Sequence, residues 1–198
     1  MNLHAHSQPL TAAGSGFRIT PSAFGMHRLE LWDVMPVGWL GHFTRAVSSR
    51  SVDIVSGVAL RGEHARWTAR LDVQGATSAE LSRIDFLALA HEVKGDFTVP
   101  PLALRTFELT RSGDAHDALV LKVRAADKIG FLASLLEHLA GLVLFPEQIR
   151  IDTFQREAQD VLWLSSVGGQ PPGPEIEAAL RASLLACLRE RPSLLPGK

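Results

Sequence analysis

The chain has a single cysteine, Cys187, among its 198 residues. One thiol excludes an intramolecular disulfide and a zinc site built from several cysteines. This cysteine usage is typical of a reducing compartment, so we expect a cytoplasmic protein. Cys187 falls on the apolar face of a predicted final helix, which favours an inert buried thiol over a nucleophile.

Neither sign of charge dominates, with 20 Lys and Arg against 21 Asp and Glu. The sequence lacks the basic and aromatic runs of nucleic-acid-binding surfaces. Its longest apolar stretch, around 129–145, is interrupted by Glu137 and His138 and is shorter than the roughly 20 residues of a membrane-spanning helix. Residues 1–16 lack the basic start and apolar core of a secretory signal. We therefore expect neither a nucleic acid nor a membrane as partner.

Motifs for catalysis and for cofactor or metal binding are also missing. There is no Gly-x-Ser-x-Gly elbow, no phosphate-binding loop and no Gly-x-Gly-x-x-Gly turn. His4 and His6 form a His-x-His pair, but a metal site needs a third ligand in a rigid frame. His42 and His138 fall beside predicted apolar helix stripes, as surface or rim histidines do. We therefore expect no enzyme activity, no cofactor and no metal.

The sequence does contain an internal repeat. The element order supports it more than residue identity does. Three pairs of segments align at offsets of 90 or 92 residues: 37–40 with 129–132, 29–31 with 121–123, and 17–20 with 107–110. Further on, 72–75 is aligned with 166–169 at an offset of 94, which predicts a two-residue insertion near 145–148.

Each copy shows the same alternation of short apolar strands and amphipathic helices. The spacing predicts strands over 29–34, 54–60, 66–73, 107–111, 118–125, 148–154 and 160–165. It predicts helices around 40–47, from Thr77 or Ser78 to about Leu89, around 132–143, and from Ile176 to near Arg191.

This order predicts an α+β fold made of two ferredoxin-like βαββαβ units with antiparallel sheets. We divide the chain into an N-terminal tail (1–16), a first unit (17–90), a linker (91–106), a second unit (107–191) and a C-terminal tail (192–198). Residues 161–164 are apolar on both sides of one strand. This indicates that the sheets or edges of the two copies meet, or that a second chain covers them.

Residues 126–132, Ala-Asp-Lys-Ile-Gly-Phe-Leu, resemble the Asp-Arg-Pro-Gly-Leu-Leu start of ACT domains. Residues 149–153 and 160–164 resemble that family's second and third strands. The chain is therefore similar to a tandem pair of ACT domains, such as those ending bacterial uridylyltransferase/uridylyl-removing enzymes. The resemblance covers 107–190 well and 17–90 weakly, since Met35 and Val37 replace the family aspartate and proline. It implies an amino-acid-binding regulatory module of the ACT type, although many members act by association alone.

Glycine at a strand-to-helix turn lets the backbone approach a ligand, and the N–H groups that follow suit a carboxylate. The candidate ligand-binding residues are Gly38, Trp39, Leu40, Asp53, Asp127, Ile129, Gly130, Phe131 and Leu132. Among them, Asp127 is the candidate partner of a ligand ammonium. The structural alternatives are that the glycines only make turns, Asp127 caps the helix, Trp39 and Phe131 are core, and Asp53 is a solvated turn residue.

The second copy keeps more of the family turn, so we expect it to supply the ligand turn and the first copy to act mainly as a packing partner. The leading hypothesis is a regulator that binds an amino acid at the seam between the units, forms a homodimer, and modulates an enzyme or signalling protein. The alternative is a protein-interaction or dimerisation module with a degenerate pocket and no ligand.

Overall fold

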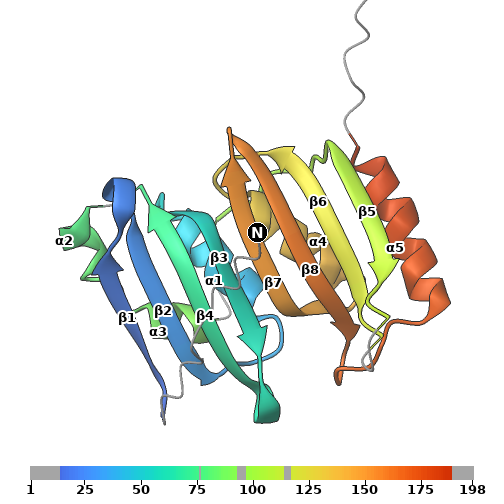
Figure 1. Ribbon diagram of the computed structural model, residues 1–198, viewed down its shortest axis with the longest axis horizontal. Coiled ribbons are helices and arrows are strands. Elements are labelled where there is room, and N and C mark those ends of the chain that lie inside the picture. Colours follow the sequence, from blue (N-terminus) through green and yellow to red (C-terminus); the bar gives the residue numbers. More distant parts are fainter. Residues whose placement is uncertain (1–13, 76, 93–96, 114–116, 189–198) are drawn as a thin grey trace, which may run out of the picture.

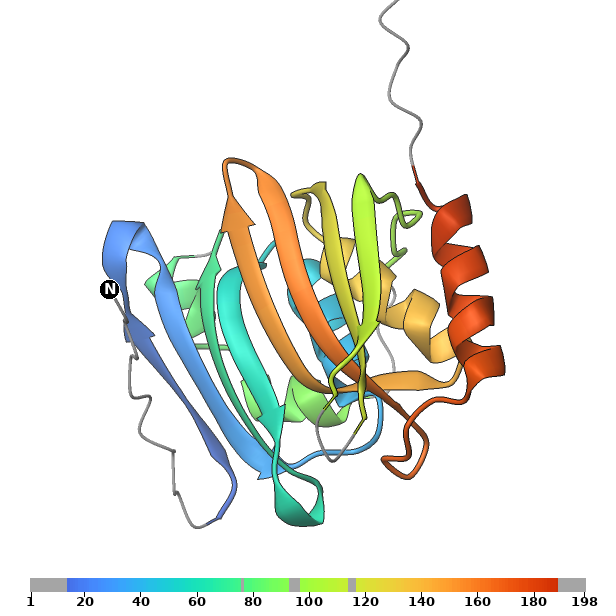
Figure 2. The ribbon, with the colours of Figure 1, turned by 45° about the vertical axis from the view of Figure 1, so that its right-hand side comes forward.

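The computed structural model describes residues 14–75, 77–92, 97–113 and 117–188. These residues form one eight-stranded antiparallel sheet with the order β1-β2-β4-β3-β7-β8-β6-β5. Helices cover one face of the sheet and leave the other face open (Figures 1 and 2). The predicted α+β class with antiparallel pairing is confirmed, but the strands make a single continuous sheet. His4, His6 and the C-terminal tail lie outside the described residues.

The first half runs through four strands and three helices. Its elements are β1 (Gly16–Pro21), β2 (His27–Val34), α1 (Trp39–Ser48), β3 (Asp53–Arg61), β4 (Arg66–Gln74), α2 (Ser78–Leu81) and α3 (Phe86–His91), with short 3-10 turns at Ala23–Gly25 and Glu63–Ala65. The helix start predicted at Thr77 or Ser78 is confirmed, because Thr77 is the N-cap of α2 and forms a capping box with Glu80. The single helix predicted as far as Leu89 is wrong, since Asp85 caps a separate helix, α3.

The second half repeats this order, except that one final helix stands in place of α2 and α3. Its elements are β5 (Thr106–Arg111), β6 (Leu119–Ala126), α4 (Phe131–Gly141), β7 (Leu144–Phe154), β8 (Glu157–Ser166) and α5 (Pro174–Ala186). The connection between the strands predicted over 148–154 and 160–165 is shorter in the structure, because β8 already begins at Glu157. The last helix ends at Ala186 rather than near Arg191.

Alternation along the strands places the core between the sheet and the helices. In β2 and β4, every second side chain is buried on the helix side, including Leu29, Leu31, Leu71 and Val73. The open face carries charged pairs such as Arg28 with Asp72. It also carries Val58 and Leu60, which are 47% and 49% exposed near the middle of the sheet.

The two halves meet where β3 pairs with β7, which we call the seam. Val58 lies opposite Arg150, and the pairing extends symmetrically from Ser56–Asp152 to Leu60–Gln148. Val58 and Arg150 are 92 residues apart, the offset at which Gly38 aligns with Gly130. Equivalent strands of the two copies therefore pair with one another, as expected for meeting edges, and a local two-fold axis passes through this residue pair.

Registers elsewhere in the sheet test the sequence alignment of the copies. Ile19–Leu29 and Leu109–Leu121 are corresponding pairs, which confirms the offsets of 90 and 92 for the first two strands. The offset of 94 is wrong. Leu71 of β4 corresponds to Leu162 of β8, an offset of 91, because the β7–β8 turn is shorter than the β3–β4 connection. The insertion expected near 145–148 is absent.

Each seam strand contains a register shift at the same place. The pairing of β3 with β4 skips Val55, and the pairing of β7 with β8 skips Glu147, which lies 92 residues further on. A bulge changes the direction of the side chain that it carries. In the second half it places a carboxylate, Glu147, beside a cavity at the seam.

Candidate functional site

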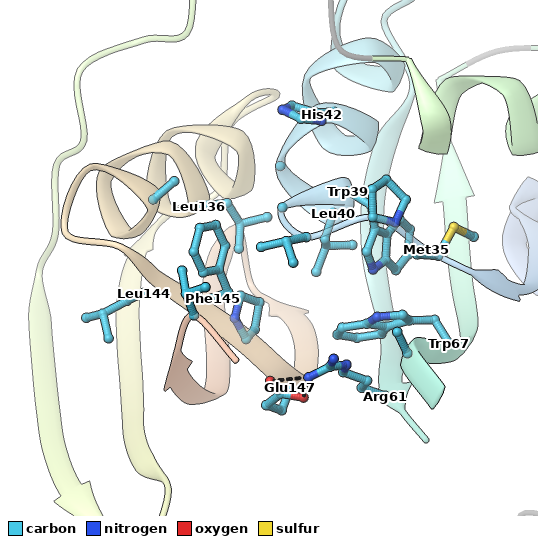
Figure 3. A pocket seen from close by; sticks show the side chains of 18 of the residues that line it. Met35, Trp39, Leu40, His42, Arg61, Trp67, Leu136, Leu144, Phe145 and Glu147 are labelled. Atoms are coloured by element: carbon cyan, nitrogen blue, oxygen red, sulfur yellow. Dashed lines mark hydrogen bonds and ion pairs between the residues drawn. The ribbon is translucent and has the colours of Figure 1, made fainter. Parts of the chain in front are cut away.

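An open cavity of about 340 Å³ lies at one end of the seam and is lined by both halves. The first half contributes the β2–α1 turn, the start of α1 and the ends of β3 and β4. The second half contributes one side of α4, the start of β7 and the loop after β8. We call this space the open cavity (Figure 3). Helices α1 and α4 lie close together here, with Gly41 of α1 facing Leu136 of α4.

Aromatic and aliphatic side chains form most of the wall. Trp39 and Trp67 pack edge to face, with ring centroids 5.3 Å apart. Figure 3 shows these two rings on one side of the cavity, with Phe145 and Leu136 opposite them. This wall is suited to an apolar group that fills the space between the aromatic rings.

An ion pair closes one end of the open cavity. Arg61 of β3 donates to both carboxylate oxygens of Glu147 at 2.8 Å, and Ser165 donates to the same carboxylate at 2.6 Å. Gly169, in the loop after β8, lies over this pair. The interaction joins the two halves, and Figure 3 shows it below the aromatic rings.

The start of α1 adds one unpaired backbone donor to the residues lining the cavity. Gly38 is the N-cap with φ of 78°, which a glycine adopts without strain. The Trp39 and Gly41 N–H groups donate to Pro36 and Gly38 carbonyls, whereas the Leu40 N–H has no partner among the described residues. An unpaired N–H at a helix start attracts a carboxylate.

Three polar atoms on lining residues are buried without a hydrogen-bond partner in the described part of the chain. They are Trp39 Nε1, His42 Nδ1 and Ser166 Oγ. Buried polar groups are normally paired, and leaving one unpaired costs about 1–3 kcal/mol. Their concentration around one cavity distinguishes this wall from an ordinary packing defect.

The repeat builds a second position on the other side of the two-fold axis, around Gly130. We call it the second seam position. It is lined by equivalents of the open-cavity residues but has a volume of only about 20 Å³. Polar side chains replace apolar ones: Thr44 corresponds to Leu136, Ser48 to Ala140, Asp53 to Phe145 and Asp127 to Met35.

The linker packs against the second turn. The Phe97 ring and Pro100 lie 3.0–3.2 Å from where a Cβ on Gly130 would stand. Ser134, the equivalent of His42, donates to the Pro100 carbonyl at 2.7 Å. At the first turn, Phe145 leaves Gly38 more room, with a corresponding distance of 3.5 Å. The linker therefore occupies space at one glycine turn and not at the other.

The structure distributes the predicted ligand residues between these two places. Gly38, Trp39 and Leu40 line the open cavity. Asp53, Asp127, Gly130, Phe131 and Leu132 line the second seam position, and Ile129 lines neither and is 44% exposed. The larger space thus lies at the turn of the first copy, whereas the family resemblance predicts the main turn in the second.

The purely structural roles predicted for the candidate ligand residues are confirmed for some of these residues and wrong for others. Trp39 and Phe131 are core residues, as expected, at 1% and 8% exposure. Asp127 does not cap α4, because Gly130 is the N-cap and no side-chain cap bond forms. Asp53 begins β3, is partly buried and accepts a bond from Gln74, so it is not a solvated turn residue.

The remaining residues considered in the sequence lie away from the second seam position. His42 lines the open cavity, while His138 bonds to Ser183 of α5 at 2.6 Å. Cys187 ends α5, where burial raises the pKa of its thiol and disfavours the nucleophilic thiolate.

Sequence reasoning missed Arg61, Trp67, Phe145 and Glu147. The repeat offset carries a signal for Phe145, because it aligns this residue with Asp53. No sequence motif marks Arg61 or Glu147, whose proximity depends on the pairing of β3 with β7.

Comparison with protein families, curated proteins and solved structures finds no match for this chain. Within the described residues, no helix has the length and apolar character needed to cross a membrane. In the same part of the chain, no group of three or more His, Cys, Asp or Glu side chains is arranged to hold a metal ion.

Proposed function

We propose that the protein is a small-molecule-responsive regulator that binds one amino acid per chain in the open cavity. The observation that carries this proposal is a cavity of about 340 Å³ shared by both halves, with an apolar wall and groups of both charge signs. A ligand that contacts both halves stabilises their relative arrangement, because binding favours the conformation that offers both contacts.

The chemistry of the wall favours a zwitterion with an apolar side chain. The Leu40 N–H at the start of α1 suits the carboxylate. The Glu147 carboxylate suits the ammonium group of the ligand, because Arg61 and Ser165 hold this carboxylate in place. Trp39, Trp67 and Phe145 would surround the side chain.

The proposal includes the finer fold assignment, in which each half is an ACT-like, ferredoxin-like unit. It is supported by the order β2-α1-β3-β4-α3 in the first half, which matches the first five elements of a βαββαβ unit. The sixth element of such a unit is a strand. Here its place beside β2 is taken by β1, which comes before β2 in the chain. The repeated strand order and the edge-to-edge pairing of equivalent strands also support a tandem arrangement.

A panel of the twenty amino acids in a thermal-shift assay tests the proposal. At least one apolar amino acid should raise Tm, because a ligand that binds only the folded state stabilises it. Ala140→Trp, at an exposed position lining the cavity, should abolish that shift. Ala179→Trp, at an exposed position of α5, is the matched control and should retain it. A flat response of the unaltered protein to the whole panel contradicts the proposal.

A second function, an interaction or dimerisation module without a ligand, is favoured by one observation. The second seam position is nearly filled, and the linker packs on its glycine turn. In that case Ala140→Trp should leave association with a partner or a second copy unchanged. Association in sedimentation that Ala140→Trp leaves unchanged, together with no response to any amino acid in the thermal-shift assay, identifies this second function.

A further inference from the structure

The second seam position gathers carboxyl groups from both halves. Asp53 comes from the start of β3, Asp127 from the β6–α4 turn, and Asp160 from β8 beneath α4. In the first half, Ala69 of β4 is the equivalent of Asp160, and it is a buried core residue. The carboxyl of Asp160 therefore occupies what is a core position in the other copy.

Asp160 is the most buried of these carboxyls, with 1% of the residue exposed. Its Oδ1 has no hydrogen-bond partner among the described residues, although it lines a cavity of about 20 Å³. An isolated ionised carboxylate in such a place is strongly disfavoured, and a buried carboxyl becomes protonated instead.

The surrounding charges do not neutralise this group. Lys128 is the one cation lining the position, and it forms no ion pair within the described residues. Helix α1 contributes only the neutral Thr44 and Ser48. The other charged groups are acidic: Asp53 from β3, Asp127 from the turn, and Asp152 of β7, whose charge acts on Asp160.

We propose that the second seam position is a proton-binding site, in which the buried Asp160 carboxyl is protonated in the folded chain and loss of that proton weakens the fold. This proposal is independent of the ligand proposed for the open cavity. A proton fits the site better than a metal ion, because no described group of acidic side chains there has a metal-binding arrangement. The small volume also leaves no room for a hydrated ion.

The direction of the pKa changes agrees with this geometry. Burial raises the pKa of Asp160 to about 7, against the effect of the Asp152 backbone N–H, and the charges of Asp127 and Asp152 raise it further. Burial also raises the pKa of Asp127, as does the charge of Asp53. Burial raises the pKa of Asp53 as well.

The sign of the stability change follows from these directions. An unfolded aspartate has a pKa of about 3.9. Because the pKa of Asp160 is higher in the folded chain, its stabilising contribution is complete below about pH 4 and is lost as pH rises through about 7. Stability should therefore fall between mildly acidic and mildly alkaline solution.

The experiment is a series of thermal unfolding curves of the full chain from about pH 5.5 to about pH 8.5. The Tm of the unaltered protein should fall by about 5 °C over this range. Asp160→Asn, which imitates the protonated carboxyl, should remove most of this fall and give the higher Tm at the alkaline end. Glu63→Gln, in the exposed β3–β4 connection, is the control and should fall like the unaltered protein.

Asp127→Asn provides a second test if Asp160→Asn does not fold. The charge of Asp127 raises the pKa of Asp160, so removing that charge lowers this pKa, and the fall in Tm over the same pH range should be smaller. Equal pH dependence in the unaltered chain and in the variants that fold overturns the proposal. A rise in Tm on adding millimolar MgCl₂ or CaCl₂, beyond that caused by NaCl of equal ionic strength, also overturns it in favour of a metal ion.

Discussion

Val58 and Arg150 lie opposite one another at the centre of the seam and are equivalent residues of the two copies. A pair of equivalent residues marks a local two-fold axis, so each feature beside the seam occurs twice. The two occurrences have diverged into an open apolar cavity and a nearly filled acidic position. This divergence leads us to expect one ligand per chain rather than two.

Glu147→Gln tests the charge that we assign to the ligand ammonium. The substitution should weaken binding of an amino acid about tenfold, because a charge-assisted hydrogen bond becomes a neutral one. Binding of the corresponding carboxylic acid without its amino group should change little. Isothermal titration of the two compounds measures the difference, and equal losses for both would show that Glu147 acts only through the structure of the cavity.

Alanine at the two glycine turns should have unequal effects on stability. Both glycines have left-handed backbones, so each substitution should cost roughly 1–2 kcal/mol of unfolding free energy. Gly130→Ala should cost about 1 kcal/mol more than Gly38→Ala, because its new Cβ would contact Phe97 and Pro100.

The Phe97→Ala background separates linker contact from backbone strain. Urea unfolding in this background should remove most of the difference between Gly130→Ala and Gly38→Ala. If the difference persists, the linker does not restrict the second turn.

Gly57→Ala should weaken the pairing of β3 with β4. A Cβ at this position would lie 2.4 Å from the Arg70 carbonyl oxygen and 2.8 Å from Leu71 Cα, both on the neighbouring strand. Overpacking against a backbone that cannot yield should cost about 3 kcal/mol of unfolding free energy. Gly173→Ala, at the N-cap of α5 with open space around the new Cβ, is the control and should cost no more than about 1 kcal/mol of unfolding free energy. Similar values for the two variants would contradict the observed pairing of β3 with β4.

Much of the fold could be predicted from local patterns. Alternation located every strand except β1, and the cap residue Thr77 located the start of α2. The break between α2 and α3 was missed because Asp85 caps a new helix in the middle of an otherwise helical pattern. The continuous sheet was one of several alternatives, because the pairing of Val58 with Arg150 depends on contacts between residues far apart in the sequence.

The candidate site was only partly predictable. The glycine turns were found because a strand-to-helix turn leaves a local sequence pattern. The sequence predicts that the two turns differ but favours the second one, whereas the larger space lies at the first. The room at each turn depends on distant side chains, Phe145 at the first turn and Phe97 of the linker at the second. The bulge that places Glu147 beside Arg61 leaves no pattern of its own in the sequence.

The four tryptophans provide the most direct measurement of ligand binding in the open cavity. Trp39 and Trp67 line that cavity, whereas Trp32 and Trp163 are on β2 and β8 and line none of the cavities described here. A ¹⁵N–¹H titration of the indole N–H signals with the amino acid selected by thermal shift should move Trp39 and Trp67 together and saturate at one ligand per chain. Movement of Trp32 or Trp163 instead, or saturation at two ligands per chain, would contradict a single site in the open cavity.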